Sequence, residues 1–141
     1  MNDLEIDRLI PQRAPIRMVD RLLDVDDTMV TTAFVVRADN YFATAEGVMA
    51  EPGLIEHIAQ SASALAGYLT LKAGDRTAPV GYIGEIKNFH CYRCPRIGEE
   101  LQTTVTLDNE VDGITLVTGE VRSSGELLAV TRMKIFISQD R

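Results

Sequence analysis

One long segment with a helical pattern divides this sequence into two groups of strand-like segments, and this arrangement restricts the folds that the chain can adopt. The segment, residues 52–73, is rich in Ala, Ser, Leu, Ile and Gly. Pro52 suits the first turn of a helix, because its missing N–H group would be unpaired there anyway, and Gly74 suits the position after the last turn. Small residues on all sides of this helix allow other backbone segments to approach it closely. The pattern predicts one buried helix packed against a sheet.

The segments on both sides of this helix are β-branched and apolar. Residues 17–25 and 29–38 are separated by Asp26-Asp27, a pair typical of turns, so we expect a hairpin there. A short helix is expected before this hairpin, within residues 4–11. After residue 79 come four further strand-like segments, with turns expected at Asp112-Gly113 and Ser124-Gly125. We expect these four to form an antiparallel meander, which gives an α+β protein.

Composition fits a single globular domain that covers residues 1–141. The sequence is 45% hydrophobic and 25% charged, as in ordinary soluble proteins, and its formal net charge is −7. Nucleic acid and anionic membrane surfaces are therefore not expected as partners, because no run of Lys and Arg is present. The first ten residues have no basic flank, and no apolar run approaches the length of a membrane span. We expect a cytoplasmic protein.

The long helix carries an unusual polar face. At 100° per residue, Glu56, Gln60, Ser63 and Gly67 gather on one side, next to a mostly apolar side. Glu56 could simply complement the positive end of the helix dipole. Burial of a carboxylate is costly, however, so a catalytic role is the stronger hypothesis for Glu56. We expect Gln60, Ser63 and Gly67 to contribute to substrate binding along an apolar channel that begins near Glu56 and Gly53.

His57 follows Glu56 directly but points about 100° away from it around a helix, so a direct Glu–His dyad is geometrically poor. A structural, hydrogen-bonded histidine is the simpler interpretation, and a noncanonical catalytic base is the alternative. His90 is the only other histidine of the chain. It lies on an expected strand.

Cys91 and Cys94 form a Cys-x-x-Cys pair without a second pair. Positions three apart on a strand point to opposite faces, so we expect neither a metal site nor a redox pair, and no cofactor. Arg93 and Arg96 lie nearby and have two interpretations. They could form a solvated strand end, or a small basic site for a phosphate or an acidic carrier.

Three segments, residues 9–27, 56–68 and 81–101, resemble motifs of the 3-hydroxyacyl-acyl-carrier-protein dehydratases in matching order. "LIPQRAPIRMVDRLLDVDD" is similar to the opening Leu-Pro-His-Arg-x-Pro pattern followed by Val-Asp-Arg. "EHIAQSASALAGY" resembles the central helix, with Glu-x-x-Ala-Gln and then small residues, and "GYIGEIKNFHCYRCPRIGEEL" resembles a stretch with Gly-Ile-x-x-x-x-Phe and Gly-Asp-x-Leu. The resemblance spans residues 8–137. It implies a hotdog fold, in which an antiparallel sheet wraps the long helix, and paired subunits.

The resemblance also implies a dehydratase site of which this chain keeps only a part. In the family, a histidine of a Gly-His-Phe-Pro segment removes the α proton, an acid on the central helix assists loss of the hydroxyl group, and backbone N–H groups at the helix start polarise the thioester carbonyl. Glu56 matches the acid and Gly53 the helix-start donor. The histidine is missing, because Phe42 or Ala45, depending on the alignment, occupies its position. The chain is thus similar to shortened, histidine-poor members found in aryl-polyene and flexirubin-type pigment pathways.

Three functional hypotheses follow. The chain could be a dehydratase-family subunit for fatty acid or polyene-type synthesis that acts on acyl thioesters of acyl carrier protein or coenzyme A. Its base would then be His57 or a histidine of a related hotdog subunit, in a homodimer or heterodimer. It could also be a hotdog thioesterase, or a non-catalytic subunit that binds an acyl carrier.

Overall fold

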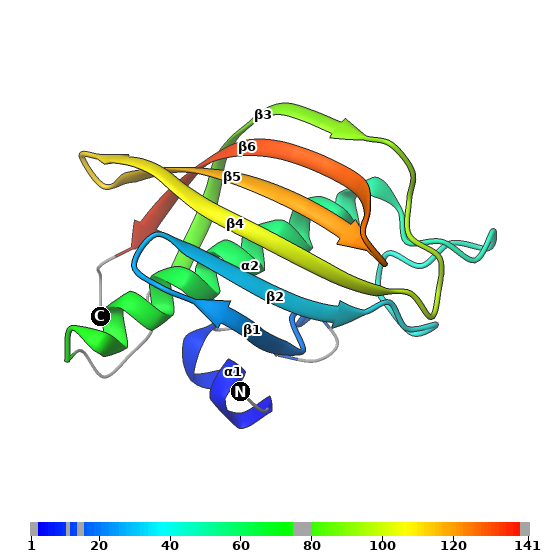
Figure 1. Cartoon of the computed structure of the whole chain (residues 1–141), viewed down its shortest axis with the longest axis horizontal. Coiled ribbons are helices and arrows are strands. Elements are labelled where there is room, and N and C mark those ends of the chain that lie inside the picture. Colours follow the sequence, from blue (N-terminus) through cyan, green and yellow to red (C-terminus); the bar gives the residue numbers. More distant parts are fainter. Residues whose placement is uncertain (1–2, 11, 14–15, 75–79, 139–141) are drawn as a thin grey trace.

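The computed structural model shows a curved antiparallel sheet wrapped around one long helix (Figure 1). It describes residues 3–10, 12, 13, 16–74 and 80–138. Pro11, Ala14 and Pro15 of the first motif lie outside the described residues. The elements are α1 (Asp3–Leu9), β1 (Arg21–Val25), β2 (Met29–Val35), α2 (Glu51–Lys72), β3 (Val80–Cys91), β4 (Glu100–Val111), β5 (Ile114–Ser123) and β6 (Glu126–Ser138).

The strands lie in the order β1-β2-β4-β5-β6-β3, and every neighbouring pair is antiparallel. This arrangement confirms the α+β class and the predicted hotdog fold. The meander that we expected from the last four strands is correct for β4, β5 and β6 but wrong for β3. β3 pairs with β6 instead, because the connection of residues 92–99 carries the chain to the opposite side of β5 and β6. β1 and β3 are therefore the two edges of the described sheet.

The predicted turns are present and have local causes. The Asp26 carboxylate accepts hydrogen bonds from the backbone N–H groups of Thr28 (2.8 Å) and Met29 (2.9 Å), which closes the β1–β2 connection. Asp112 and Gly113 both have positive φ, and so do Ser124 and Gly125. Two consecutive residues in this conformation form the tight turns that suit the twist of a hairpin.

α2 begins and ends within one residue of the predicted bounds. Pro52 lies in its first turn, and Gly74, with φ +98°, follows its C-terminal cap at Ala73. Leu54, Ile58 and Leu65 of α2 are fully or almost fully buried against the sheet. The elements thus place the polar residues at the start of α2 between the sheet and the segment that leads into β1.

Candidate active site

Glu56 lies in the second turn of α2 and is half-buried. Its Oε1 atom accepts a hydrogen bond from the Nε2 group of Gln60 at 2.9 Å. The two residues are one helical turn apart, so α2 itself brings them together, as the sequence predicted. The carboxylate is therefore held in place rather than extended freely into solvent.

Gln60 is fully buried, and its amide is fixed on both sides. Its Oε1 atom accepts from the backbone N–H of Met18 (2.6 Å), and its Nε2 group donates to the backbone carbonyl of Ile16 (2.8 Å). These bonds determine which end of the amide faces Glu56. Gln60 thus orients the Glu56 carboxylate and, at the same time, attaches the segment before β1 to α2.

His57 is fully buried, and both of its ring nitrogens are hydrogen-bonded within the chain. Nδ1 lies 2.7 Å from the carbonyl oxygen of Met18, and Nε2 lies 2.6 Å from the hydroxyl of Thr103. A carbonyl can only accept, so Nδ1 carries the proton and Nε2 accepts from Thr103. Burial lowers the pKa of His57 to about 4. The ring is a neutral, structural group, stacked on Phe34 at a centroid distance of 5.5 Å.

A buried set of hydroxyl groups completes this arrangement, and sequence analysis missed it. The Ser61 hydroxyl donates to the carbonyl of His57 (2.9 Å) and lies 2.8 Å from the hydroxyl of Thr32. Thr32 and Thr103 are direct cross-strand partners on β2 and β4, and both are fully buried. Two threonines among the otherwise apolar inward positions of β2 and β4 were the signal that could have predicted polar partners for α2.

Gly53 lies at the start of α2 against the preceding loop. Its N–H donates to the carbonyl of Ala50 at 2.8 Å, so this donor is occupied in the structure. A Cβ atom at Gly53 would come within 2.9 Å of Phe42 and within 2.7 Å of Met49, which explains the need for glycine. Phe42, one of the two positions expected from the resemblance to replace the histidine, is therefore beside the helix start, whereas Ala45 is exposed.

Gly67 and Ser63, which we expected to line a channel, are both buried in this structure. A Cβ atom at Gly67 would overlap the backbone carbonyl of Leu9, so α1 covers α2 at this point. Ser63 is buried, with 5% of its surface exposed. The structure thus brings Glu56 and Gln60 together at one end of this face and packs α1 against the other end.

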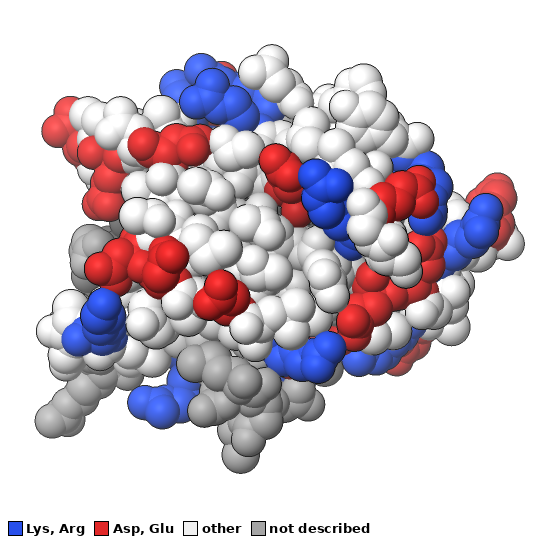
Figure 2. Space-filling view, viewed as in Figure 1, with Lys and Arg blue, Asp and Glu red and all other residues white. Residues whose placement is uncertain are grey.

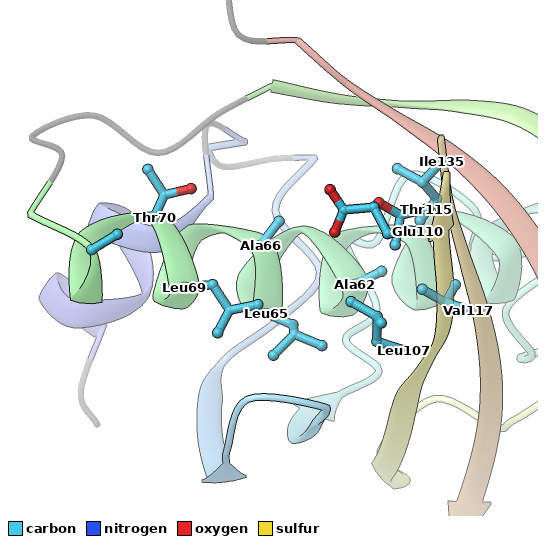
Figure 3. Close-up of a pocket in the computed structure, with 11 residues that line it drawn as sticks. Ala62, Leu65, Ala66, Leu69, Thr70, Leu107, Glu110, Thr115, Val117 and Ile135 are labelled. Carbon is cyan, nitrogen blue, oxygen red and sulfur yellow. The ribbon is translucent and has the colours of Figure 1, made fainter. Parts of the chain in front are cut away.

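A cavity of about 260 Å³ lies on the adjacent side of α2, between the helix and strands β4, β5 and β6 (Figure 3). In Figure 3 the Glu110 carboxylate extends toward α2, beside Thr115. Ala62, the first helix residue of the cavity, lies about 9 Å along the axis from Glu56. The lining is otherwise mostly apolar: Ala62, Leu65, Ala66, Leu69, Thr70, Ala73, Leu107, Val117 and Ile135.

The expectation that Cys91 and Cys94 lie on opposite faces is wrong. β3 ends at Cys91, so strand alternation does not extend to Cys94, and the two sulfur atoms and the Glu51 carboxylate lie within 4.8 Å of one another. Burial, with the neighbouring Cys94 and Glu51, raises the pKa of Cys91 to about 12. A thiol with such a pKa is a poor nucleophile at neutral pH, so Cys91 is not a reactive cysteine.

Arg93 is neutralised within the chain. Its guanidinium group contacts Glu99 (2.7 and 2.9 Å) and Glu126 (3.0 Å), and these bonds lower the pKa of Glu99 to about 2. Arg96 is exposed nearby. Figure 2 shows Lys and Arg side chains interspersed with acidic ones on the visible face. Of the pair considered as a basic site, Arg93 is thus bound to two carboxylates, and Arg96 is the exposed member.

Comparison with known proteins gives one family match and several structural matches. A family model for ApeP-like proteins, described as ApeP dehydratase, matches residues 4–141. Among solved structures, the dehydratase heterocomplex ApeI:P from Xenorhabdus doucetiae superposes with a TM-score of 0.88 at 19% identity, over 96% of this chain and 91% of that one. A search of curated protein sequences found no significant match.

Other similar structures share the fold at lower similarity. The E. coli PaaI protein from the phenylacetic acid degradation operon has a TM-score of 0.65 at 12% identity, over 82% of this chain and 80% of that chain. A hypothetical thioesterase from Streptococcus pneumoniae, solved with coenzyme A, has a TM-score of 0.68 at 11% identity, over 86% and 87%. Neither helix among the described residues has the length and hydrophobicity that a membrane span requires.

Proposed function

We propose that this chain, which belongs to the ApeP-like dehydratase family, is one subunit of an acyl-thioester dehydratase in which Glu56 is the acid and a related hotdog subunit supplies the base. The observation that supports this role most directly is the Gln60–Glu56 hydrogen bond. A fully buried amide that orients a half-buried carboxylate is an arrangement suited to proton transfer. A carboxylate that only complemented the helix dipole would need no such support.

The chemistry requires two proton transfers. Dehydration of a 3-hydroxyacyl thioester removes a proton from the α carbon and expels the 3-hydroxyl group as water. The first step needs a base and the second a proton donor, since hydroxide is a poor leaving group. In this proposal the protonated Glu56 carboxyl group donates to the departing hydroxyl. Gln60 holds it in position through the transfer.

The base comes from another chain because neither histidine of this chain is suited to the role. His57 is neutral, buried and bonded at both nitrogens, so it has no free site for a substrate proton. His90 is exposed on β3, where its ring contacts Tyr92. The similar structure described as a dehydratase heterocomplex is an example of two chains combined in such an enzyme.

Strand β3 offers the surface for this assembly. It is a 12-residue edge strand, and residues 84–88 are exposed. Among them, Ile86 exposes 40% of its surface, and Tyr92, directly after the strand, exposes 58%. A long, partly apolar edge strand tends to pair with another strand, so we propose a homodimer or heterodimer formed along β3.

The substrate is an acyl thioester of acyl carrier protein or coenzyme A, in fatty acid or polyene-type synthesis. The mostly apolar cavity between α2 and β4–β6 is suited to the far part of an acyl chain, since it lies farther along the same helix that carries Glu56. We place the protein in the cytoplasm, as a single hotdog domain of residues 1–141 without a cofactor.

A thioesterase is the second candidate, because one similar structure is described as a hypothetical thioesterase with coenzyme A. There, Glu56 would activate water or attack the thioester carbonyl. A non-catalytic carrier-binding subunit is the third. Product analysis separates these candidates.

The test uses 3-hydroxyacyl thioesters of coenzyme A and of acyl carrier protein, with this chain alone and mixed with a family member that carries a Gly-His-Phe-Pro segment. We expect 2-enoyl thioester from the mixture only. Free acid and thiol would support the thioesterase instead, and the absence of any product that depends on this chain would support the carrier-binding role.

A further inference from the structure

The start of α2 and the end of β3 bring together three side chains that the proposed function does not use. Glu51 is the first residue of α2, Cys91 is the last residue of β3, and Cys94 follows three residues later. Their ligand atoms, one carboxylate oxygen and two sulfurs, all lie within 4.8 Å of one another. We propose that these three side chains bind a divalent ion of the zinc class.

The backbone around this cluster holds the donors in place before any ion arrives. The N–H of Met49 donates to the carbonyl of Pro95 (2.9 Å), and the N–H of Ile97 donates to the carbonyl of Gly47 (2.9 Å). Tyr92 is attached to β6 through its N–H, which donates to the carbonyl of Leu128 at 2.7 Å. The segment before α2 is therefore bonded to the segment after β3 close to the cluster, and Tyr92, between the two cysteines, is fixed to β6.

The donor set selects the ion. Two thiolates and one carboxylate suit zinc, whereas magnesium and calcium prefer oxygen ligands only. With Zn–S bonds of about 2.3 Å and tetrahedral angles, two sulfur ligands lie about 3.8 Å apart. The ligand atoms of the three residues lie within 4.8 Å of one another, a limit that includes this separation. Binding breaks two S–H bonds, forms two Zn–S bonds and releases two protons to solvent, and the fourth position remains for water.

The position of the cluster indicates a structural role. Glu51 precedes Glu56 by five residues, which corresponds to about 7.5 Å along the helix and about 140° around it. An ion at Glu51 thus lies on a different face of α2 from the candidate acid. It would attach the first turn of α2 to the β3–β4 connection, residues 92–99, and so stabilise the end of the helix at which Gly53 lies.

The experiment titrates metal-free, reduced protein with Zn²⁺ and follows the reactivity of its thiols. The sequence contains only two cysteines, so every thiol signal comes from this cluster. We expect one ion per chain, thiols that react at least ten-fold more slowly with a disulfide reagent, and thiolate-to-metal absorption when Co²⁺ replaces Zn²⁺. The melting temperature should rise as the free zinc concentration increases.

Variants identify the ligands. Cys91→Ser and Cys94→Ser should abolish the Co²⁺ absorption, and Glu51→Gln should weaken zinc binding at least ten-fold. Glu46→Gln is the matched control, because Glu46 is an exposed acidic residue of the neighbouring loop outside the cluster. Circular dichroism confirms that each variant is folded. Thiol reactivity unchanged by zinc, or equal zinc affinity in wild type and in the cysteine variants, would overturn the proposal.

Discussion

Glu56 and His57 are adjacent on α2 but differ in burial, and we infer their different roles from this difference. His57 faces the sheet, where Met18 and Thr103 satisfy both of its nitrogens. Glu56 is half-buried and is held from one side by Gln60. A step of 100° around a helix is enough to separate a fully buried group that stabilises the fold from a half-buried group, which is the one that we propose as the acid.

The lowered pKa of His57 predicts a specific dependence of stability on pH. The folded protein keeps the ring neutral down to about pH 4, whereas the unfolded chain takes up the proton near pH 6.5. The unfolded state therefore binds more protons between these values, so stability is fully present above pH 6.5 and decreases as pH falls. From pH 7 to pH 5 this group should reduce the free energy of unfolding by about 2 kcal/mol.

Urea unfolding at pH 7, 6 and 5 measures this effect. In His57→Gln the overall stability should be lower, because buried partners lose their hydrogen bonds, but the slope between pH 7 and pH 5 should largely disappear. Equal slopes in the two proteins would mean that His57 titrates alike in the folded and unfolded states.

Among the elements, two glycines allow α2 to pack closely against its neighbours. Gly67 allows α1 to pack directly on the helix, and Gly119 of β5 leaves room for the side chain of Ile58. The two glycines differ in what an added Cβ atom would meet. At Gly67 it meets the backbone of Leu9, which cannot move without α1, whereas at Gly119 it meets a side-chain methyl group.

We therefore expect Gly67→Ala to destabilise the protein by about 1–3 kcal/mol, despite the better helix propensity of alanine. Gly119→Ala is the matched comparison and should cost less, because the Ile58 side chain can adjust. Chemical denaturation of the two variants gives both values. A Gly67→Ala protein as stable as wild type would show that α1 does not rest on the helix at Leu9.

Local signals explain what could be predicted from the sequence. The bounds of α2 and the turns at Asp112-Gly113 and Ser124-Gly125 depend on neighbouring residues only, and all are present. The pairing of β3 with β6 depends on contacts between distant segments, so the expected meander was wrong there. The same reason applies to the grouping of Cys91 with Glu51, since strand alternation ends where the strand ends.

The candidate site was predictable only in part. A helical turn separates Glu56 from Gln60, so their contact follows from the helix alone. The partners of His57 come from β4 and from the segment before β1, and no local pattern identifies them. The packing of α1 on Gly67 is likewise a long-range contact that no local pattern identifies.

In the whole molecule, the long strand β3 forms one edge of the sheet, with β6 on one side of it and no strand of the described residues on the other (Figure 1). Exposed Ile86 at its middle would be covered if a second subunit continued the sheet. Such an assembly places two hotdog subunits edge to edge, so residues of one chain can complete the site of the other. In the proposed assembly, the base of the reaction would come from the other subunit.

A charge on this edge should weaken the assembly. We expect Ile86→Asp to raise the dissociation constant of the dimer at least ten-fold, because the carboxylate would be desolvated in the interface. Val111→Asp is the control, since Val111 is also exposed but lies at the β4–β5 end, away from β3. Sedimentation at micromolar concentration measures both. A wild-type monomer, or equal effects of the two substitutions, would argue against pairing along β3.

One kinetic measurement tests the proposal that Glu56 donates a proton in a site completed by another subunit. The rate of 2-enoyl thioester formation is measured for this chain mixed with a histidine-bearing family member, as wild type, as Glu56→Gln and as Glu120→Gln. Glu120 lies on β5 and pairs with Arg122, so its substitution controls for the loss of one carboxylate. We expect an active wild-type mixture, a decrease of about 10²–10⁴-fold for Glu56→Gln, and no change for Glu120→Gln. An active unmixed protein, or a Glu56→Gln mixture as fast as wild type, would contradict it.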